Sequence, residues 1–245
     1  MLGIAFTGGE GPGPARIRRL LGPAGEDPAA ELAGPRGRLL VAAADSGLVT
    51  AEAAGIRPGF VVGDMDSLED LSRLDAYPGD RVIRCREEKD YTDTELVLSL
   101  LWEKGCDEIW LLGGGGGRMD HLFALRSLFE RERFPSRWLT AGEEIFCVQA
   151  PGGVLYADGA SAPSENERDR KTGGILVSVF PLGAGPWEAS GRGLKWPLAG
   201  LDWNRGFFGV SNVAADGEFS IQAEKGRFLI ILPLDRSGEI MAGKL

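Results

Sequence analysis

The stretch "RVIRCREEKDYTDTELVLSLLWEKGCDEIWLLGG", residues 81–114, has the order strand, helix, strand. Its two ends, "RVIRC" and "EIWLLGG", are short apolar runs that predict strands, and the segment between them has helical spacing. Thr92 and Glu95 form a capping-box pattern at the start of that helix, and Gly105 stands where a helix commonly ends. Two strands joined through a helix are typical of a parallel pair, so this stretch predicts an α/β fold.

The alternation of strands and helices runs over residues 1–135 and favours a mostly parallel sheet. After about residue 136 the helical spacing gives way to short strand-like runs separated by glycine, proline and Asp-Gly turns. We therefore expect two domains. The N-terminal one, at residues 1–138, is a mostly parallel α/β sheet domain, and the C-terminal one, at residues 139–245, is an all-β sandwich.

Two segments of the C-terminal part carry more specific expectations. Residues 218–223 alternate apolar and polar side chains, and Asp216-Gly217 and Lys225-Gly226 supply turns on either side, which together suggest a three-stranded meander. Residues 158–173 carry almost no apolar side chains and cannot contribute to a core. We expect this second segment to be a mobile hairpin loop.

The composition excludes several classes of partner. The chain has 27 basic and 36 acidic residues, a net charge of −9, and no Lys/Arg-rich block, so neither nucleic acid nor an anionic membrane is expected to bind it. No segment has the length of a membrane span, and the N-terminus lacks a basic leader. The three cysteines are odd in number and lack CxxC spacing, which favours the reducing cytoplasm.

Acidic side chains follow several of the predicted strands. In an open α/β sheet, ligands bind beyond the carboxyl ends of the strands, so these acids are expected to converge on one edge. Two carboxylates about 4 Å apart repel by roughly 4 kcal/mol at an effective dielectric of about 20, and a cation would offset that repulsion. Mg²⁺ binds carboxylates together with phosphate oxygens, so the pattern predicts Mg²⁺ with ATP. The acids are Asp45, Asp64, Asp66, Asp90, Asp93 and, after a glycine run, Asp120.

Each of these features also has a purely structural interpretation. Asp45 could be a helix N-cap, and Asp64 and Asp66 could be turn formers, although an extended strand end would place both of their side chains on one face. The glycines at 113–117 could form a flexible loop, or they could let backbone N–H groups approach a phosphate beside Arg118. The chain has neither a Walker A pattern nor the HRD and DFG motifs of protein kinases.

Taken in order, three segments of the chain resemble the N-terminal motifs of the thiamine pyrophosphokinase family: "AADSGLVTAEAAGIRPGFVVGDMDSL", "KDYTDTELVLSLL" and "LLGGGGGRMDHLFALRSLF". "GLKWPL" and "GVSN" are similar to the substrate-binding motifs of that family. The resemblance implies an α/β domain that binds Mg·ATP, a C-terminal β-sandwich, and a homodimer whose active sites lie between subunits. It also implies transfer of pyrophosphate from ATP to the hydroxyl of thiamine, with release of AMP.

The resemblance also implies roles for individual residues. Thiamine is a cation with two flat rings, so a tryptophan face would suit it, although Trp196 could equally be a core residue of the sandwich. Asp93 is the expected proton acceptor, if one is needed, but the sequence does not separate that role from metal binding or helix capping. The implied metal ligands are Asp64, Asp66 and Asp90; the nucleotide contacts are Asp45, Asp64, Thr92, Gly115, Arg118 and Asp120; the catalytic residues are Asp66, Asp93 and Arg118; and the thiamine contacts are Trp196, Ser211 and Asn212.

Two other functions remain open from the sequence. The first is the same transfer to another hydroxymethyl acceptor, such as a pterin. The second is a non-catalytic sensor that binds nucleotide or thiamine. Trp196 with the Ser211-Asn212 pair favours thiamine over a pterin, and the number of metal-competent acids favours an enzyme over a sensor.

Overall fold

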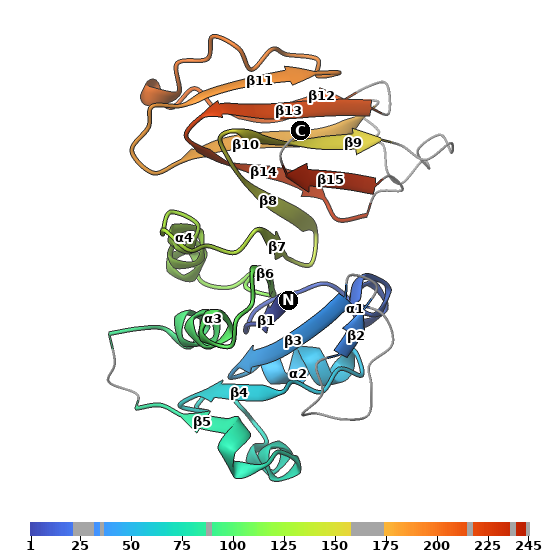
Figure 1. Ribbon diagram of the computed structural model, residues 1–245, viewed down its shortest axis with the longest axis vertical. Helices are drawn as coiled ribbons and strands as arrows, with labels where there is room; N and C mark the ends of the chain where they lie inside the picture. The colour runs from blue at the N-terminus through green and yellow to red at the C-terminus, as the bar shows by residue number, and fades with distance from the viewer. Residues whose placement is uncertain are drawn as a thin grey trace. The chain divides into compact units, whose positions relative to one another are not determined.

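The computed structural model describes residues 1–21, 32–34, 37–86, 90–157, 174–214, 218–235 and 239–243. The chain divides into two compact units, Met1–Ala141 and Gly142–Leu245, which are shown in Figure 1. Residues 158–173, for which the sequence predicts a hairpin loop, lie outside the described residues, as does the Asp216-Gly217 turn. Among the described residues, no helix is both long and apolar enough to cross a membrane.

The N-terminal unit is built on a parallel sheet with the strand order β7-β6-β1-β3-β4-β5, and β2 pairs antiparallel with β3. This confirms the predicted mostly parallel α/β fold. The strands are β1 (Leu2–Phe6), β2 (Leu32–Gly34), β3 (Gly37–Ala44), β4 (Phe60–Gly63), β5 (Val82–Arg84), β6 (Glu108–Leu112) and β7 (Arg137–Leu139). The helices are α1 (Pro14–Leu21), α2 (Gly47–Ala53), α3 (Asp93–Glu103) and α4 (Met119–Leu128), with 3₁₀ turns η1 (Leu71–Ala76) and η2 (Gly79–Arg81).

Helices cover both faces of this sheet, with α1 and α2 on one side and α3 and α4 on the other (Figure 1). The central strands β1 and β4 are therefore buried along their whole length, which explains why they read as continuous apolar runs. Helix α3 begins with the predicted capping box, in which Thr92 and Glu95 each bond the other's backbone N–H. Gly105 follows the helix with a left-handed φ of 84°, as the sequence predicts.

The C-terminal unit consists of two antiparallel sheets that pack face to face, which confirms the predicted sandwich. The aromatic rings of Tyr156 and Phe219 stack at 5.2 Å in its core, and Trp203 meets Phe228 edge-on at the same distance. One sheet has the order β12-β10-β14-β8 and the other β11-β13-β9-β15. The strands are β8 (Glu143–Gln149), β9 (Gly152–Ala157), β10 (Ile175–Leu182), β11 (Glu188–Arg192), β12 (Gly209–Ala214), β13 (Glu218–Lys225), β14 (Arg227–Pro233) and β15 (Glu239–Gly243), with the 3₁₀ turn η3 (Trp203–Arg205).

The predicted three-stranded meander is wrong. Strand β13 pairs with β9 and β11, whereas its chain neighbours β12 and β14 both pair with β10 in the other sheet. The chain therefore crosses between the sheets at each turn. Period-2 alternation shows which side chains of a strand face the core, but both sheets present the same apolar inner face, so the pattern does not identify the neighbouring strand.

Truncating a ring between the two sheets should destabilise the protein strongly. Phe228 is fully buried, so Phe228→Ala is expected to lower the free energy of unfolding by about 3–5 kcal/mol. Phe207, which is 59% exposed, provides a matched control whose change to alanine should alter it by less than about 0.5 kcal/mol. Urea denaturation would measure both, and equal losses in the two variants would contradict this account of the core.

Candidate active site

Three aspartates from separate chain segments meet at the carboxyl edge of the parallel sheet. Asp45 follows β3, Asp64 follows β4, and Asp93 is the first residue of α3. Each offers a carboxylate oxygen, and these oxygens all lie within 4.8 Å of one another. All three side chains are half-buried. The parallel sheet brings them together because its strands all end at this edge.

The backbone fixes Asp45 in place. Its φ of 41° is left-handed, which is uncommon for a residue other than glycine, and its Oδ1 accepts a hydrogen bond of 3.1 Å from the N–H of Met65. A Cβ on Gly63 would lie 1.8 Å from that same oxygen, so only glycine fits there. The N-cap position of α2 belongs to Ser46, so the helix-capping interpretation of Asp45 is wrong.

The segment after β4 turns instead of continuing the strand. Met65 has a left-handed φ of 68° and a buried side chain, and the N–H of Asp66 donates to Asp64 Oδ1 at 3.1 Å. The expectation that an extended strand end places Asp64 and Asp66 on one face is therefore wrong, because β4 ends at Gly63. The two carboxyls nevertheless lie close together after the turn. A hydrogen bond with the side chain of Asp64, and the negative charge of Asp64, raise the pKa of Asp66.

Crowding of the carboxyls changes their acidity. The pKa of Asp45 is raised from 3.8 to about 7, first by burial and then by a hydrogen bond with Asp93 and its negative charge. At neutral pH the site without a cation therefore retains a proton on Asp45 in part of the molecules. A divalent ion could replace that proton, because oxygen donors of this type are the ones Mg²⁺ prefers. The residues present thus fit the metal that the sequence predicts.

The trio differs from the metal ligands expected from the sequence. Asp64 belongs to it, Asp66 lies beside it, and Asp90 is exposed and outside it. Asp45 and Asp93, expected as nucleotide and catalytic residues, complete it instead. Sequence spacing could place all five acids near strand ends but could not rank their distances. The roles of Asp66 and Asp90 as ligands stay predictions.

The start of α3 is anchored to the end of β1. Thr7 and Thr94 share a buried hydrogen bond of 2.6 Å between their hydroxyls, and this bond fixes the first turn of the helix. The hydroxyl of Thr92 accepts a bond from the backbone of Glu95, so it already serves as a helix cap. Its predicted contact with the nucleotide stays a prediction. Asp93, the first residue of α3, is therefore held in place by the bond between Thr7 and Thr94 and by the capping box.

The glycine run pairs with the loop that follows β1. The N–H of Gly114 donates to the carbonyl of Gly8 at 2.8 Å, and Gly115 and Glu10 exchange two backbone hydrogen bonds of 2.9 and 2.7 Å. Both backbone polar groups of Gly115 are thus occupied. The predicted contact of Gly115 with the nucleotide cannot use its N–H in this conformation.

Arg118 and Asp120 form a bidentate ion pair at the start of α4. Nε of Arg118 donates to one oxygen of Asp120 at 3.1 Å, and Nη2 donates to the other at 2.5 Å. The guanidinium lowers the pKa of Asp120. Both side chains are largely exposed, so a phosphate could replace the carboxylate, which has a similar fork geometry. Asp120 therefore orients Arg118, and its predicted contact with the nucleotide stays a prediction.

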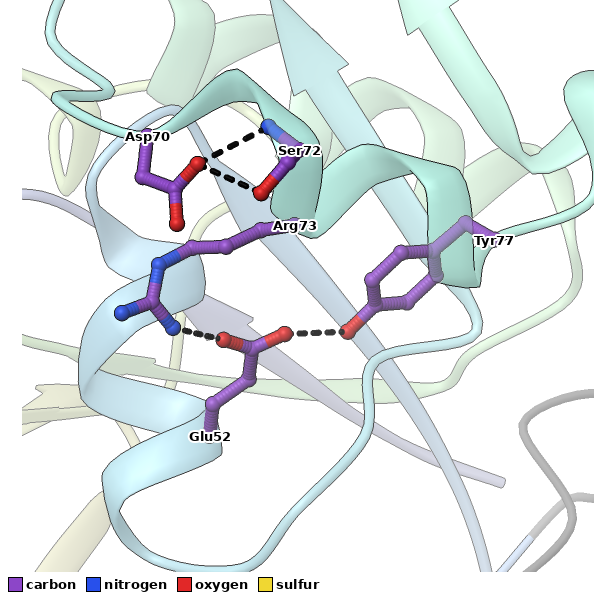
Figure 2. Close-up of polar contacts among 5 residues, drawn as sticks. All are labelled: Glu52, Asp70, Ser72, Arg73 and Tyr77. Atoms are coloured by element: carbon purple, nitrogen blue, oxygen red, sulfur yellow. Dashed lines mark hydrogen bonds and ion pairs between the residues drawn. The ribbon is translucent and has the colours of Figure 1, made fainter.

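A network that sequence reasoning missed supports the aspartate loops (Figure 2). Glu52 of α2 accepts from Arg73 Nη1 at 2.5 Å and from the hydroxyl of Tyr77 at 3.2 Å. Asp70 caps η1 through the backbone N–H and hydroxyl of Ser72. The network ties α2, which follows Asp45, to the segment that follows Asp64. No local sequence signal could have found it, because its partners lie 21 and 25 residues apart.

The C-terminal unit contains a separate hollow of about 380 Å³. Trp196 contributes to its wall and is 49% exposed, so the interpretation of Trp196 as a sandwich core residue is wrong. Trp203, by contrast, is packed in the core of the sandwich. Three sequence-predicted residues line the hollow together with apolar neighbours: Trp196, Ser211 and Asn212, with Pro197, Leu198, Leu201, Phe208, Gly209 and Val210.

The buried side chain of Asn212 bonds the backbone of Trp196. Its side chain is 2% exposed, its Oδ1 accepts from the N–H of Trp196 at 3.1 Å, and its Nδ2 donates to the carbonyl of Trp196 at 2.7 Å. The neighbouring Ser211 has a left-handed φ of 55°, and its N–H donates to the hydroxyl of Ser178 at 3.0 Å. Asn212 therefore positions Trp196, a role that the sequence pattern could not distinguish from direct ligand contact.

Comparisons with known proteins agree on one family. A family model described as "Thiamin pyrophosphokinase, catalytic domain" matches residues 37–136, a range that contains all three clustered aspartates. Thiamine pyrophosphokinase of Bacillus subtilis (strain 168) is 41% identical over 158 residues, which are 63% of this chain and 68% of that protein.

Solved structures share the fold over most of the chain. Thiamin pyrophosphokinase from Geobacillus thermodenitrificans superposes with a TM-score of 0.64 at 25% identity, covering 96% of this chain and 98% of its own. The Bacillus subtilis enzyme gives the same TM-score at 24% identity, with 96% and 99% covered. Thiamin pyrophosphokinase from Candida albicans shares the fold at 14% identity with a TM-score of 0.63, covering 96% of this chain and 90% of its own.

The raised pKa of Asp45 predicts a pH-dependent stability in metal-free buffer. Because the pKa in the folded state lies above the unfolded value of 3.8, the contribution of Asp45 to stability is complete below pH 4 and is lost as the pH rises through about 7. Asp45→Asn removes this titration. We expect its Tm in EDTA to fall less than that of the wild type between pH 5 and pH 8.

A control separates this effect from the general influence of pH. Asp75 is exposed and outside the cluster, so Asp75→Asn should keep the wild-type profile. If the Tm of the wild type and of Asp45→Asn fell in parallel with pH, the titration of Asp45 would not contribute to the pH dependence of stability.

Proposed function

This chain belongs to the thiamine pyrophosphokinase family, and we propose that the carboxylate cluster Asp45, Asp64 and Asp93 binds the Mg·ATP used in its reaction. The enzyme transfers a pyrophosphoryl group from ATP to the hydroxyl of thiamine, giving thiamine diphosphate and AMP. The observation that carries the assignment of the site is the convergence of three acids from separate segments within 4.8 Å. So dense a negative group is unfavourable without a cation.

The cluster suits a divalent ion, and when bound such an ion would neutralise phosphate oxygens. In our proposal Asp45, Asp64 and Asp93 would hold it. Asp66, beside Asp64, and Asp90, two residues before the cap of α3, are proposed as further ligands. The Glu52 network keeps the two loops in register, so the donors are arranged before ATP arrives.

The chain's own residues then position the reactants. Arg118 exchanges Asp120 for a phosphate of ATP, while Asp120, Thr92 and Gly115 line the nucleotide. The thiamine oxygen bonds to the β-phosphorus as the bond from that phosphorus to the AMP oxygen breaks. The hydroxyl proton passes to a carboxylate, for which Asp93 is our candidate. Transfers of this type depend mostly on positioning and charge neutralisation, so a strong base is not required.

We propose that thiamine binds in the hollow of the C-terminal unit. Trp196 presents a half-exposed indole, and an aromatic cation is attracted to such a face by stacking and cation–π interaction. Ser211 lies beside it, and Asn212 fixes the backbone that carries the indole. These features favour thiamine over a pterin acceptor, and the aspartate cluster favours an enzyme over a sensor.

Two further proposals concern the assembly and its location. We propose a homodimer with active sites shared between subunits, as the family resemblance implies. We also propose that the enzyme works in the cytoplasm, where ATP is available. Cys85, Cys106 and Cys147, all among the described residues, form no disulfide, which supports a reducing compartment.

The reaction itself can be tested on the purified full chain. With ATP and Mg²⁺, addition of thiamine should produce AMP and thiamine diphosphate in equal amounts. A hydroxymethyl pterin offered under the same conditions should not. Thiamine binding without AMP release would instead identify a sensor.

Removing single carboxylates tests the metal assignment. Asp64→Asn and Asp66→Asn should each lower the rate of AMP release by about 100-fold or more, the scale seen when one group that stabilises developing charge is lost. Circular dichroism should show intact folds. Glu69→Gln changes an exposed acid in the same loop and should retain activity. Near-normal turnover of Asp66→Asn would remove Asp66 from the metal site.

Changing the tryptophan tests the thiamine site. Trp196→Ala should raise the KM for thiamine by roughly three- to thirtyfold, because the stacking and cation–π contributions are lost. The KM for ATP should stay the same, and Trp196→Phe should recover part of the loss. An equal rise in both KM values would point to damage of the fold rather than of a thiamine contact.

A further inference from the structure

The indole of Trp196 already has a cation against it. Nζ of Lys195 lies 4.6 Å from the ring centroid, within the range of a cation–π interaction. Lys195 is exposed, so its ammonium could extend into water, yet it folds back over the adjacent side chain. Within the motif "GLKWPL", the lysine and the tryptophan are therefore in direct contact.

The backbones of Lys195 and Trp196 are both held by hydrogen bonds, and Trp196 lines the hollow. The N–H of Lys195 donates to the carbonyl of Val213 at 2.8 Å. Trp196 is held at its N–H and its carbonyl by the buried amide of Asn212. The two side chains consequently start from neighbouring, immobilised positions. The flexible lysine stem can move away from the ring, whereas the backbone that carries the indole is held by two hydrogen bonds.

We propose that Lys195 is an internal competitor for the cationic ligand of Trp196, and that it sets the affinity of the pocket for thiamine. This inference rests on the proposed thiamine site. The ammonium of Lys195 lies against the indole. An aromatic cation must either displace the ammonium or share the π system with it, and both alternatives weaken binding. The expected occupant is thus an aromatic cation that stacks well enough to replace a lysine.

The physical basis lies in the charges of the three partners. An indole attracts a cation through its quadrupole, and a second positive charge nearby is repelled by the first. A guanidinium is planar and stacks on aromatic rings better than an ammonium does. Replacing Lys195 by arginine should therefore strengthen the competition, and replacing it by alanine should remove it. A residue with a merely structural role would not move the affinity in opposite directions in the two variants.

The test is calorimetric titration of the full chain with thiamine, without ATP or metal, so that no turnover occurs. We expect Lys195→Ala to bind thiamine about two- to fivefold more tightly than the wild type, the fold-change that corresponds to one exposed cation–π contact. Lys195→Arg should bind it more weakly. Lys225→Ala makes the same change of net charge in an exposed lysine paired with Glu188, and it should leave the affinity unchanged.

The outcomes separate this inference from the function on which it rests. If the wild type binds no thiamine, the proposed thiamine site fails and the inference fails with it. If the wild type binds but the order of affinity is anything other than alanine, lysine, arginine, Lys195 is not a competitor and the inference alone is overturned. An equal gain in Lys225→Ala would also overturn it, by assigning the effect to net charge.

Discussion

Mutual repulsion among Asp45, Asp64 and Asp93 is the constraint around which the N-terminal unit is organised. Their oxygens lie within 4.8 Å of one another, and the surrounding structure must hold them there against their charge. Part of the repulsion is relieved by a proton, since the pKa of Asp45 rises to about 7. The remainder is resisted by rigid attachments at strand and helix ends. In the proposed function, a cation with polyphosphate ligands would complete this arrangement.

The attachments share one design. Asp45 sits in a left-handed turn over Gly63, Asp93 begins a helix whose first turn is bonded to Thr7, and Glu52 links α2 to η1. These contacts fix the segments that carry Asp45 and Asp93, and the carboxyl of Asp45 is itself held by the N–H of Met65. Backbone strain of this kind is commonly stored at functional sites, where the neighbouring structure compensates for it.

In the pocket of the C-terminal unit, too, hydrogen bonds fix the backbone of a residue proposed to bind a ligand. Asn212 uses its amide to hold the backbone of Trp196, and the indole is left half-exposed. Exposure of an aromatic ring is unfavourable in water but makes its face available to a cation. In both units, side chains that are far apart in the sequence hold the proposed site in place.

The sequence by itself determined the fold class, the capping of α3 and the side of the sheet on which the acids lie, because these follow from local periodicity and from the shared direction of parallel strands. Tertiary structure decided which acids form the cluster, since distances between strand ends depend on turns such as that at Met65. It also decided that β13 pairs with β9 and β11. It decided as well that the side chain of Asn212 bonds the backbone of Trp196. Those outcomes depend on contacts between residues far apart in the chain, and local patterns do not encode such contacts.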